Sequence, residues 1–155
     1  MPKVGRQADH GRLHGPGGHD RRSRGHHRHR RKRDALAQDG PAISDQVGSS
    51  SRVLRLDRAT GANFGEFVYE VDPVRLAPGE AFNPVSSANG IGEILAISDS
   101  DYLTVERNVS AAGGLSVKLY RTSIHGAENV AGKATLTGTE RKMRKALVFD
   151  FASTC

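Results

Sequence analysis

Polar and apolar residues alternate along most of the chain from Ser51 onward, and this period of two limits the fold more than any other property of the sequence. Successive side chains of a β-strand point to opposite faces, so the alternation indicates strands with one buried face. In the first two such segments the apolar residues that share a face are Leu54 and Leu56, then Phe67, Tyr69 and Val71. Helical spacing is scarce, and we expect an all-β fold.

Turn-forming residues separate the expected strands. The first two, at 52–57 and 66–71, flank a turn with Gly61 and Asn63, which tolerate positive φ, and so predict a hairpin. A loop rich in Pro, Gly, Ser and Asn follows at 72–90, and then come four further strand segments, at 93–97, 102–107, 115–121 and 146–151. Four consecutive antiparallel strands form a meander, which is the form of one propeller blade.

Composition excludes several classes of protein. With 155 residues, of which 36% are apolar and 5% aromatic, the chain has material for one modest domain. It has no run of 18 apolar residues and no apolar stretch after its basic start, so we expect no membrane span and no signal peptide, and a cytoplasmic location for the chain as written. Its only cysteine, Cys155, excludes an internal disulfide and a cysteine-based zinc site.

The first 33 residues differ in character from the rest. They hold 11 of the 23 Lys and Arg residues, 2 of the 17 Asp and Glu residues and six of the seven histidines, which leaves a net charge of +9 on this arm and −3 on residues 34–155. Because the arm has few aliphatic residues, we expect it to be disordered and to pack on nothing. It fits a basic arm that neutralises phosphates or a His-rich metal tract. We favour a third interpretation, namely GC-rich coding DNA that is read out of frame or from a wrong start.

Beyond residue 33 the chain resembles the phytase-like family, also described as esterase-like activity of phytase. The resemblance covers about residues 34–151 and is carried by five segments in the family's order. They are Asp34–Pro41 (DALAQDGP), Ser51–Asp57 (SRVLRLD), Asn89–Ile97 (NGIGEILAI), Leu103–Arg107 (LTVER) and Val117–Tyr120 (VKLY). Gly92 departs from the serine that the family usually shows before the glutamate.

The resemblance implies a partial β-propeller-like meander of about one and a half blades over residues 34–155. The arm would replace two inner strands, leaving the hairpin at 52–71 with an unpaired edge. Without neighbouring blades we expect six apolar residues to be partly exposed and the exposed strand edges to self-associate. These residues are Leu95, Ile97, Leu103, Val105, Leu119 and Phe149. The family also implies an exported, periplasmic or extracellular protein.

Carboxylates are the candidate functional residues, because the motifs of serine hydrolases, zinc proteases, P-loop enzymes and histidine acid phosphatases are absent. Glu93, Glu106 and Arg107 lie at the ends of expected inner strands and are the candidate catalytic residues. Strand-end acids can hold a divalent cation in an oxygen cage, so the candidate ligands of a metal such as calcium are Gln38, Asp39 and Glu93. The alternative is structural: Glu106 forms a fixed ion pair with Arg107 or Arg52, and Asp39 shapes a turn. His125 fits a turn residue better than a general base.

Two functions for the parent fold stay open at this point. The resemblance implies a metal-assisted hydrolase of phosphoesters or other esters, with this chain truncated and inactive. The alternative is a propeller that serves as a binding or scaffold module. A basic-arm nucleic-acid binder is a further alternative, although the acidic body leads us to expect no nucleic-acid partner.

Overall fold

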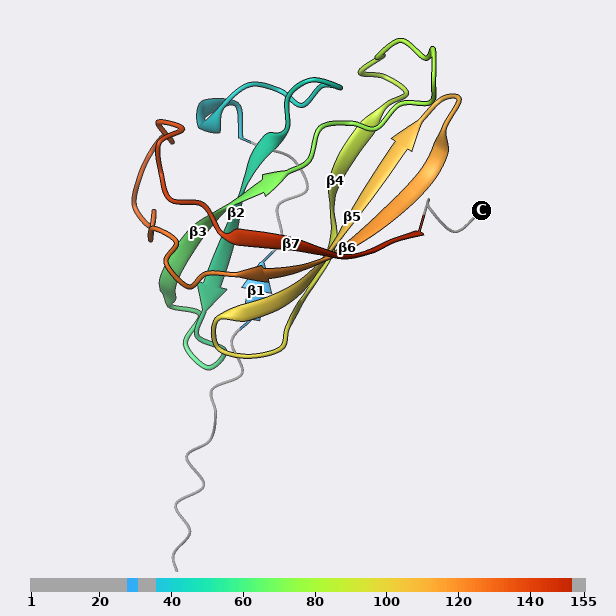
Figure 1. Ribbon diagram of the computed structural model, residues 1–155. Helices are drawn as coiled ribbons and strands as arrows, with labels where there is room; N and C mark the ends of the chain where they lie inside the picture. Colours follow the sequence, from blue (N-terminus) through green and yellow to red (C-terminus); the bar gives the residue numbers. More distant parts are fainter. Residues whose placement is uncertain (1–27, 31–35, 152–155) are drawn as a thin grey trace, which may run out of the picture.

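The structure is a computed structural model that describes residues 28–30 and 36–151. Two antiparallel sheets make up the fold (Figure 1). The first has the strand order β1-β2-β3, with β1 at Arg28–Arg30, β2 at Ser49–Leu56 and β3 at Asn63–Val71. The second is a meander of β4 at Ala88–Ala96, β5 at Asp101–Ser110, β6 at Gly114–Ser123 and β7 at Arg144–Asp150. A single 3-10 turn, η1 at Ala37–Asp39, precedes β2.

The expected all-β fold and its six strands are confirmed. The hairpin turn between β2 and β3 contains Gly61 at φ 71°, a backbone conformation that favours glycine. His125 lies in a turn after β6, as expected. In the described residues no helix is long and apolar enough to cross a membrane.

The core lies between the two sheets. Val53, Phe67, Tyr69 and Val71 from the first sheet form one cluster with residues of the second sheet and its connections, namely Ile91, Tyr102, Ile124 and Met143. One expectation for β2 needs correction: its buried apolar residue is Val53, while Leu54 and Leu56 are only half-buried. Val53 lies opposite the buried Phe67 in the pairing of β2 with β3, so the face of β2 that carries Val53 points to the core.

Strand β5 is mostly polar on its inner face and largely apolar on its outer face. Its five buried residues alternate along the strand and comprise Tyr102, Thr104, Glu106, Asn108 and Ser110. The intervening Leu103 and Val105 are half-buried on the outer face. Leu95, Ile97 and Phe149 are exposed and Leu119 is half-buried, so the expected partial exposure of all six apolar residues is confirmed.

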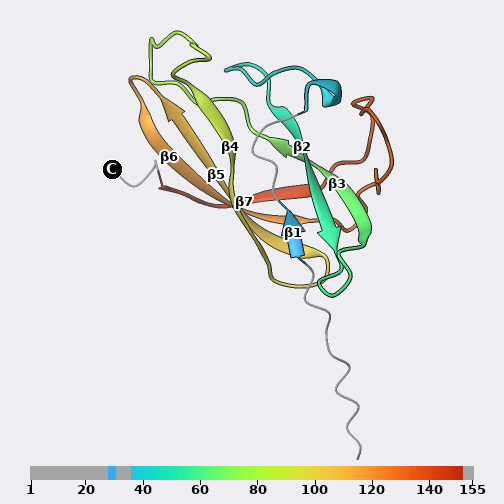
Figure 2. The same ribbon diagram turned by 180° about the vertical axis from the view of Figure 1, so that it is seen from behind.

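Both edges of the hairpin have backbone partners, contrary to the expectation of an unpaired edge. On the β3 side, the long connection between β6 and β7 runs beside the strand (Figure 2). In it, the amides of Val130 and Met143 donate to the carbonyls of Glu66 and Val68, both at 2.8 Å. On the β2 side, β1 pairs antiparallel with Leu54–Leu56. The expectation that the arm packs on nothing is therefore wrong at Arg28–Arg30, and the rest of residues 1–33 lies outside the described residues.

Candidate functional site

A buried ion pair connects β7 to β5 on the inner face of the second sheet. The Lys145 ammonium lies 2.5 Å from Oε1 of Glu106, and the Glu106 side chain is almost fully buried. The Tyr69 hydroxyl donates to the same oxygen at 2.7 Å. The other carboxylate oxygen accepts from the Asn89 amide at 2.9 Å and from the backbone amide of Asp72 at 3.2 Å. Four donors therefore satisfy Glu106, as a buried carboxylate requires.

Asp72 extends this network from the loop after β3. Its carboxylate lies 2.6 Å from the Lys145 ammonium and also accepts from Tyr120 and Lys118. Burial acts to raise the pKa of Asp72, but the hydrogen bonds from Lys145 and Tyr120 outweigh it and the pKa is lowered. Burial, with the nearby carboxylate Glu106, raises the pKa of Tyr69. Both tyrosine rings lie under the Lys145 ammonium, which is thus held in a fixed place.

A second buried pair holds the segment before β2. Both oxygens of Asp39 accept from the Arg52 guanidinium, at 2.5 and 2.6 Å, in a bidentate arrangement. The hydrogen bond that Arg52 donates to Asp39 is the main reason that the pKa of Arg52 is raised. Arg52 also donates to the carbonyl of Lys133 at 2.8 Å, so it ties the β6–β7 connection to β2.

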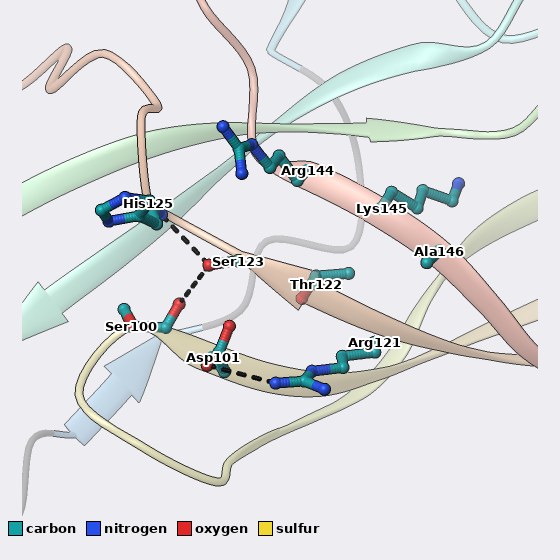
Figure 3. Close-up of a pocket in the computed structure, with 9 residues that line it drawn as sticks. All are labelled: Ser100, Asp101, Arg121, Thr122, Ser123, His125, Arg144, Lys145 and Ala146. Atoms are coloured by element: carbon teal, nitrogen blue, oxygen red, sulfur yellow. Dashed lines mark hydrogen bonds and ion pairs between the residues drawn. The ribbon is translucent and has the colours of Figure 1, made fainter.

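An open pocket of about 400 Å³ lies where β5, β6 and β7 meet the turn after β6 (Figure 3). Its lining is rich in basic and hydroxyl side chains and comprises Ser100, Asp101, Arg121, Thr122, Ser123, His125, Arg144, Lys145 and Ala146. The turn is fixed because the Ser123 hydroxyl donates to the Ser100 carbonyl at 3.3 Å and accepts from the His125 amide at 3.1 Å. His125 is thus held at the rim by its backbone.

The cations of this pocket differ in how far they are already neutralised. Lys145 is held by Asp72 and Glu106 in the buried network. Arg121 forms one long ion pair, 3.6 Å, with Asp101, and its side chain is 64% exposed. The exposed Arg144 forms no ion pair with any described residue and lies near Gly126, in the turn that carries His125. The positive charge of Arg144, and part of that of Arg121, is therefore not neutralised by any acidic side chain among the described residues.

The structure separates the candidate catalytic residues. Glu93 lies opposite Val105 in the register, whereas Glu106 points to the inner face, so the two carboxylates lie on opposite faces of the sheet. Arg107 is exposed on the outer face, with its side chain over Gly92. A fixed ion pair for Glu106 was the structural alternative, and its partner is Lys145, while Arg52 pairs with Asp39 instead. The catalytic role of these three residues stays a prediction.

The candidate metal ligands do not fit a cation site. Both oxygens of Asp39 are occupied by Arg52, and Asp39 belongs to the segment beside the first sheet. Glu93 lies on the second sheet, and Gln38 is exposed. Among residues 36–151 no group of three or more His, Cys, Asp or Glu side chains has metal-binding geometry.

Sequence reasoning missed the residues that the structure brings together. Lys145 and Arg144 stand among ordinary surface-type charges in Arg141–Lys145, and Asp72 directly follows a strand. One signal was available: the alternation in Tyr102–Ser110 has a polar set that includes Thr104, Glu106 and Asn108, and its regularity is as strict as that of the apolar set.

The model of a family described as "Phytase-like: Esterase-like activity of phytase" matches residues 33–154. Neither a curated protein nor a solved structure matches the chain.

Proposed function

This chain belongs to the Phytase-like family, and on that premise we propose that its domain is a phosphoester hydrolase that binds the phosphate of its substrate in the pocket around Arg121 and Arg144. The observation that carries the proposal is that Arg144, which has no ion pair with any described residue, lines the same pocket as Arg121, whose pair with Asp101 is 3.6 Å long. Arginine forks match the oxygens of a phosphate, and charge-assisted hydrogen bonds of this kind are about twice as strong as neutral ones.

The dimensions of the pocket support a small anionic ester. A volume of about 400 Å³ lies in the range of small-molecule sites. The Ser123 and Thr122 hydroxyls are committed to Ser100 and Thr104, so the two arginines are the main donors for phosphate oxygens. The only carboxylate of the lining is Asp101. Because Arg121 already neutralises Asp101, the net charge that faces a ligand is positive.

The chemistry assigned to the pocket is attack of water on phosphorus. As the new P–O bond forms, the ester P–O bond breaks, and the leaving alcohol oxygen takes a proton from the protonated ring (imidazolium) of His125, which becomes a neutral imidazole. The attacking water then returns a proton to the imidazole, so that phosphate and alcohol are the products. Arg121 and Arg144 stabilise the charge on the equatorial oxygens, which is the main contribution of proteins to phosphoryl transfer. No step involves a metal, because the candidate ligands do not fit one.

A second candidate function is a binding module that holds a phosphorylated ligand without turnover. It is favoured by the environment of His125, whose ring forms no hydrogen bond with the described residues. An imidazole that no second group orients is a weak general acid. Anion binding is common to both candidates, and only turnover separates them.

The arrangement of the sheets supports a propeller-like architecture as part of the proposal. The four-stranded meander β4–β7 has the form of one blade. The first sheet packs on its inner face through the core cluster, as a neighbouring blade does.

Two chromogenic substrates test the proposed function. We expect p-nitrophenyl phosphate to be hydrolysed faster than p-nitrophenyl acetate, which lacks the anion. Arg144→Ala should lower kcat/KM for the phosphate about tenfold or more, and His125→Ala should lower kcat. Arg58→Ala, which changes an exposed arginine of the β2–β3 turn, is the matched control and should keep wild-type rates. Binding of phosphate without turnover would favour the binding module over the hydrolase. Equal rates for Arg144→Ala and Arg58→Ala would contradict phosphate binding in this pocket.

A further inference from the structure

The pocket around Arg121 and Arg144 borders apolar side chains on the same side of the second sheet. In the register, Arg121 lies opposite Leu103 of β5 on one side and opposite Ala146 of β7 on the other (Figure 3). Two residues back along β6, Leu119 shares the side of Arg121. A ligand whose charged group reaches Arg121 therefore has apolar neighbours one strand away, at about 4.8 Å.

These neighbours belong to a group that we call the apolar strip. It consists of five residues that the pairing of β4 to β7 places next to one another on this side of the sheet, namely Leu95, Leu103, Val105, Leu119 and Phe149. None of the five is buried: Leu95 is 63% exposed, Phe149 is 42% exposed and the other three are half-buried. A ligand that covers apolar surface open to water gains affinity from it.

The charges beside the strip select the kind of ligand. Arg144 forms no ion pair with any described residue, and Arg121 forms only a long one, 3.6 Å, with Asp101. Positive charge next to apolar surface complements a ligand that is anionic at one end and apolar at the other. The phosphate ester of a polyhydroxylated alcohol fits less well, because its hydroxyls would lose water against the strip without gaining partners.

We propose that the pocket takes a phosphate monoester of an apolar alcohol, with the phosphate at Arg121 and Arg144 and the alkyl or aryl group on the apolar strip. The proposal rests on the phosphate pocket of the proposed function and adds the class of the alcohol. It holds whether the ester is hydrolysed or only bound. A fully buried methylene strengthens binding about fourfold, so on this open surface we expect about twofold for each methylene.

Isothermal titration calorimetry of the full chain with four phosphates tests the proposal. The compounds are inorganic phosphate, glycerol phosphate, butyl phosphate and hexyl phosphate, with the alkyl phosphates kept below the concentration at which they form micelles. We expect hexyl phosphate to bind about fourfold more tightly than butyl phosphate, because it has two more methylenes. It should bind about tenfold more tightly than glycerol phosphate, whose hydroxyls cannot use the strip.

A variant of the strip separates the two parts of the ligand. Phe149→Ser removes the aromatic ring and should lower the affinity for hexyl phosphate about fivefold or more. Its affinity for inorganic phosphate should equal that of the wild type, which also shows that the variant is folded. Leu115→Ser is the matched control, because Leu115 is 69% exposed on β6 but lies roughly 20 Å along the strand from Arg121. It should leave both affinities unchanged.

The four compounds also distinguish this inference from the proposed function. If inorganic phosphate binds but the three esters bind equally tightly, the apolar alcohol is overturned and the phosphate pocket stands. The absence of saturable binding for all four compounds would overturn both. Binding of hexyl phosphate only where it forms micelles, or equal losses in Phe149→Ser and Leu115→Ser, would overturn the apolar strip as the site of the alcohol.

Discussion

Lys145 and Glu106 form an ion pair of 2.5 Å across the inner face of the second sheet, and the Glu106 partner is almost fully buried. The pair joins the last strand of the meander to β5, and through Tyr69 and Asp72 it reaches the first sheet. A polar network in this position holds two sheets in one arrangement only if every member is satisfied. The two sheets therefore depend on polar contacts as well as on the apolar cluster around Tyr69.

The first prediction concerns the removal of the buried cation. Lys145→Met leaves Glu106 and Asp72 without their ammonium partner and should lower the free energy of unfolding by about 3–5 kcal/mol in urea denaturation. Lys142→Met is the matched control, because its pair with Glu70 is half-exposed to solvent and should contribute less than about 1 kcal/mol. Equal losses in the two variants would show that the buried network does not stabilise the fold.

The second prediction concerns the tether between Asp39 and Arg52. Asp39→Ala removes the two short hydrogen bonds of the buried Arg52 guanidinium and leaves it only the longer ion pair with Glu66, 3.7 Å, so it should cost about 3 kcal/mol. Amides of residues 36–48 should then exchange hydrogen faster than in the wild type. Asp45→Ala, at a carboxylate that contacts only the side chain of its neighbour Gln46, should leave both quantities unchanged. Unchanged hydrogen exchange in Asp39→Ala would show that the pair with Arg52 does not hold this segment in place.

The third prediction concerns acid stability. Backbone amides of Ala112 and Ala77, with the Ser110 hydroxyl, lower the pKa of Glu80 to about 2. An unfolded glutamate has a pKa of about 4.3, so this stabilisation is complete above about pH 5 and is lost as the pH falls towards 2. Glu80→Gln should therefore lower Tm more at pH 6 than at pH 3. The same Tm difference at both values would contradict the assignment.

The fourth prediction concerns the start of β2. A Cβ at Gly48 would lie 2.1 Å from the backbone carbonyl oxygen of Val71, so the backbone itself would have to move. We expect Gly48→Ala to cost about 3 kcal/mol through this overpacking. Gly132→Ala is the comparison, because Gly132 has φ 82° but no atom near its Cβ position, and should cost about 1 kcal/mol. Thermal unfolding of both variants measures the difference.

The strands were predictable from sequence because alternation and turn residues are local signals. Which face of each strand is buried was harder to predict. Both faces of β2 carry aliphatic residues, so the sequence does not show whether Val53 or Leu54 points to the core. The pairing of Val53 with Phe67 settles which face is buried. In β5 the usual assumption that apolar residues point inward fails, since Glu106 and Thr104 are buried while Leu103 is half-buried.

The candidate site was not predictable for a related reason. Arg121, His125 and Arg144 come from two strands and a turn, and nothing in their local sequence shows that they surround one pocket. In the sequence, Glu93 and Glu106 looked equivalent as candidate site residues, because each lies at the end of one of two neighbouring strands. The register irregularity between Ile91 and Glu93 and the parity of β5 place them on opposite faces.

The central claim is that the pocket around Arg121 and Arg144 binds phosphate, and a titration followed by backbone amide NMR tests it directly. On addition of inorganic phosphate we predict that the amide shifts concentrate at residues 121–126 and 144–146, and that Arg144→Ala weakens the binding at least tenfold. Shifts confined to the surface around Arg107, or no saturable shifts up to high phosphate concentration, would contradict the account.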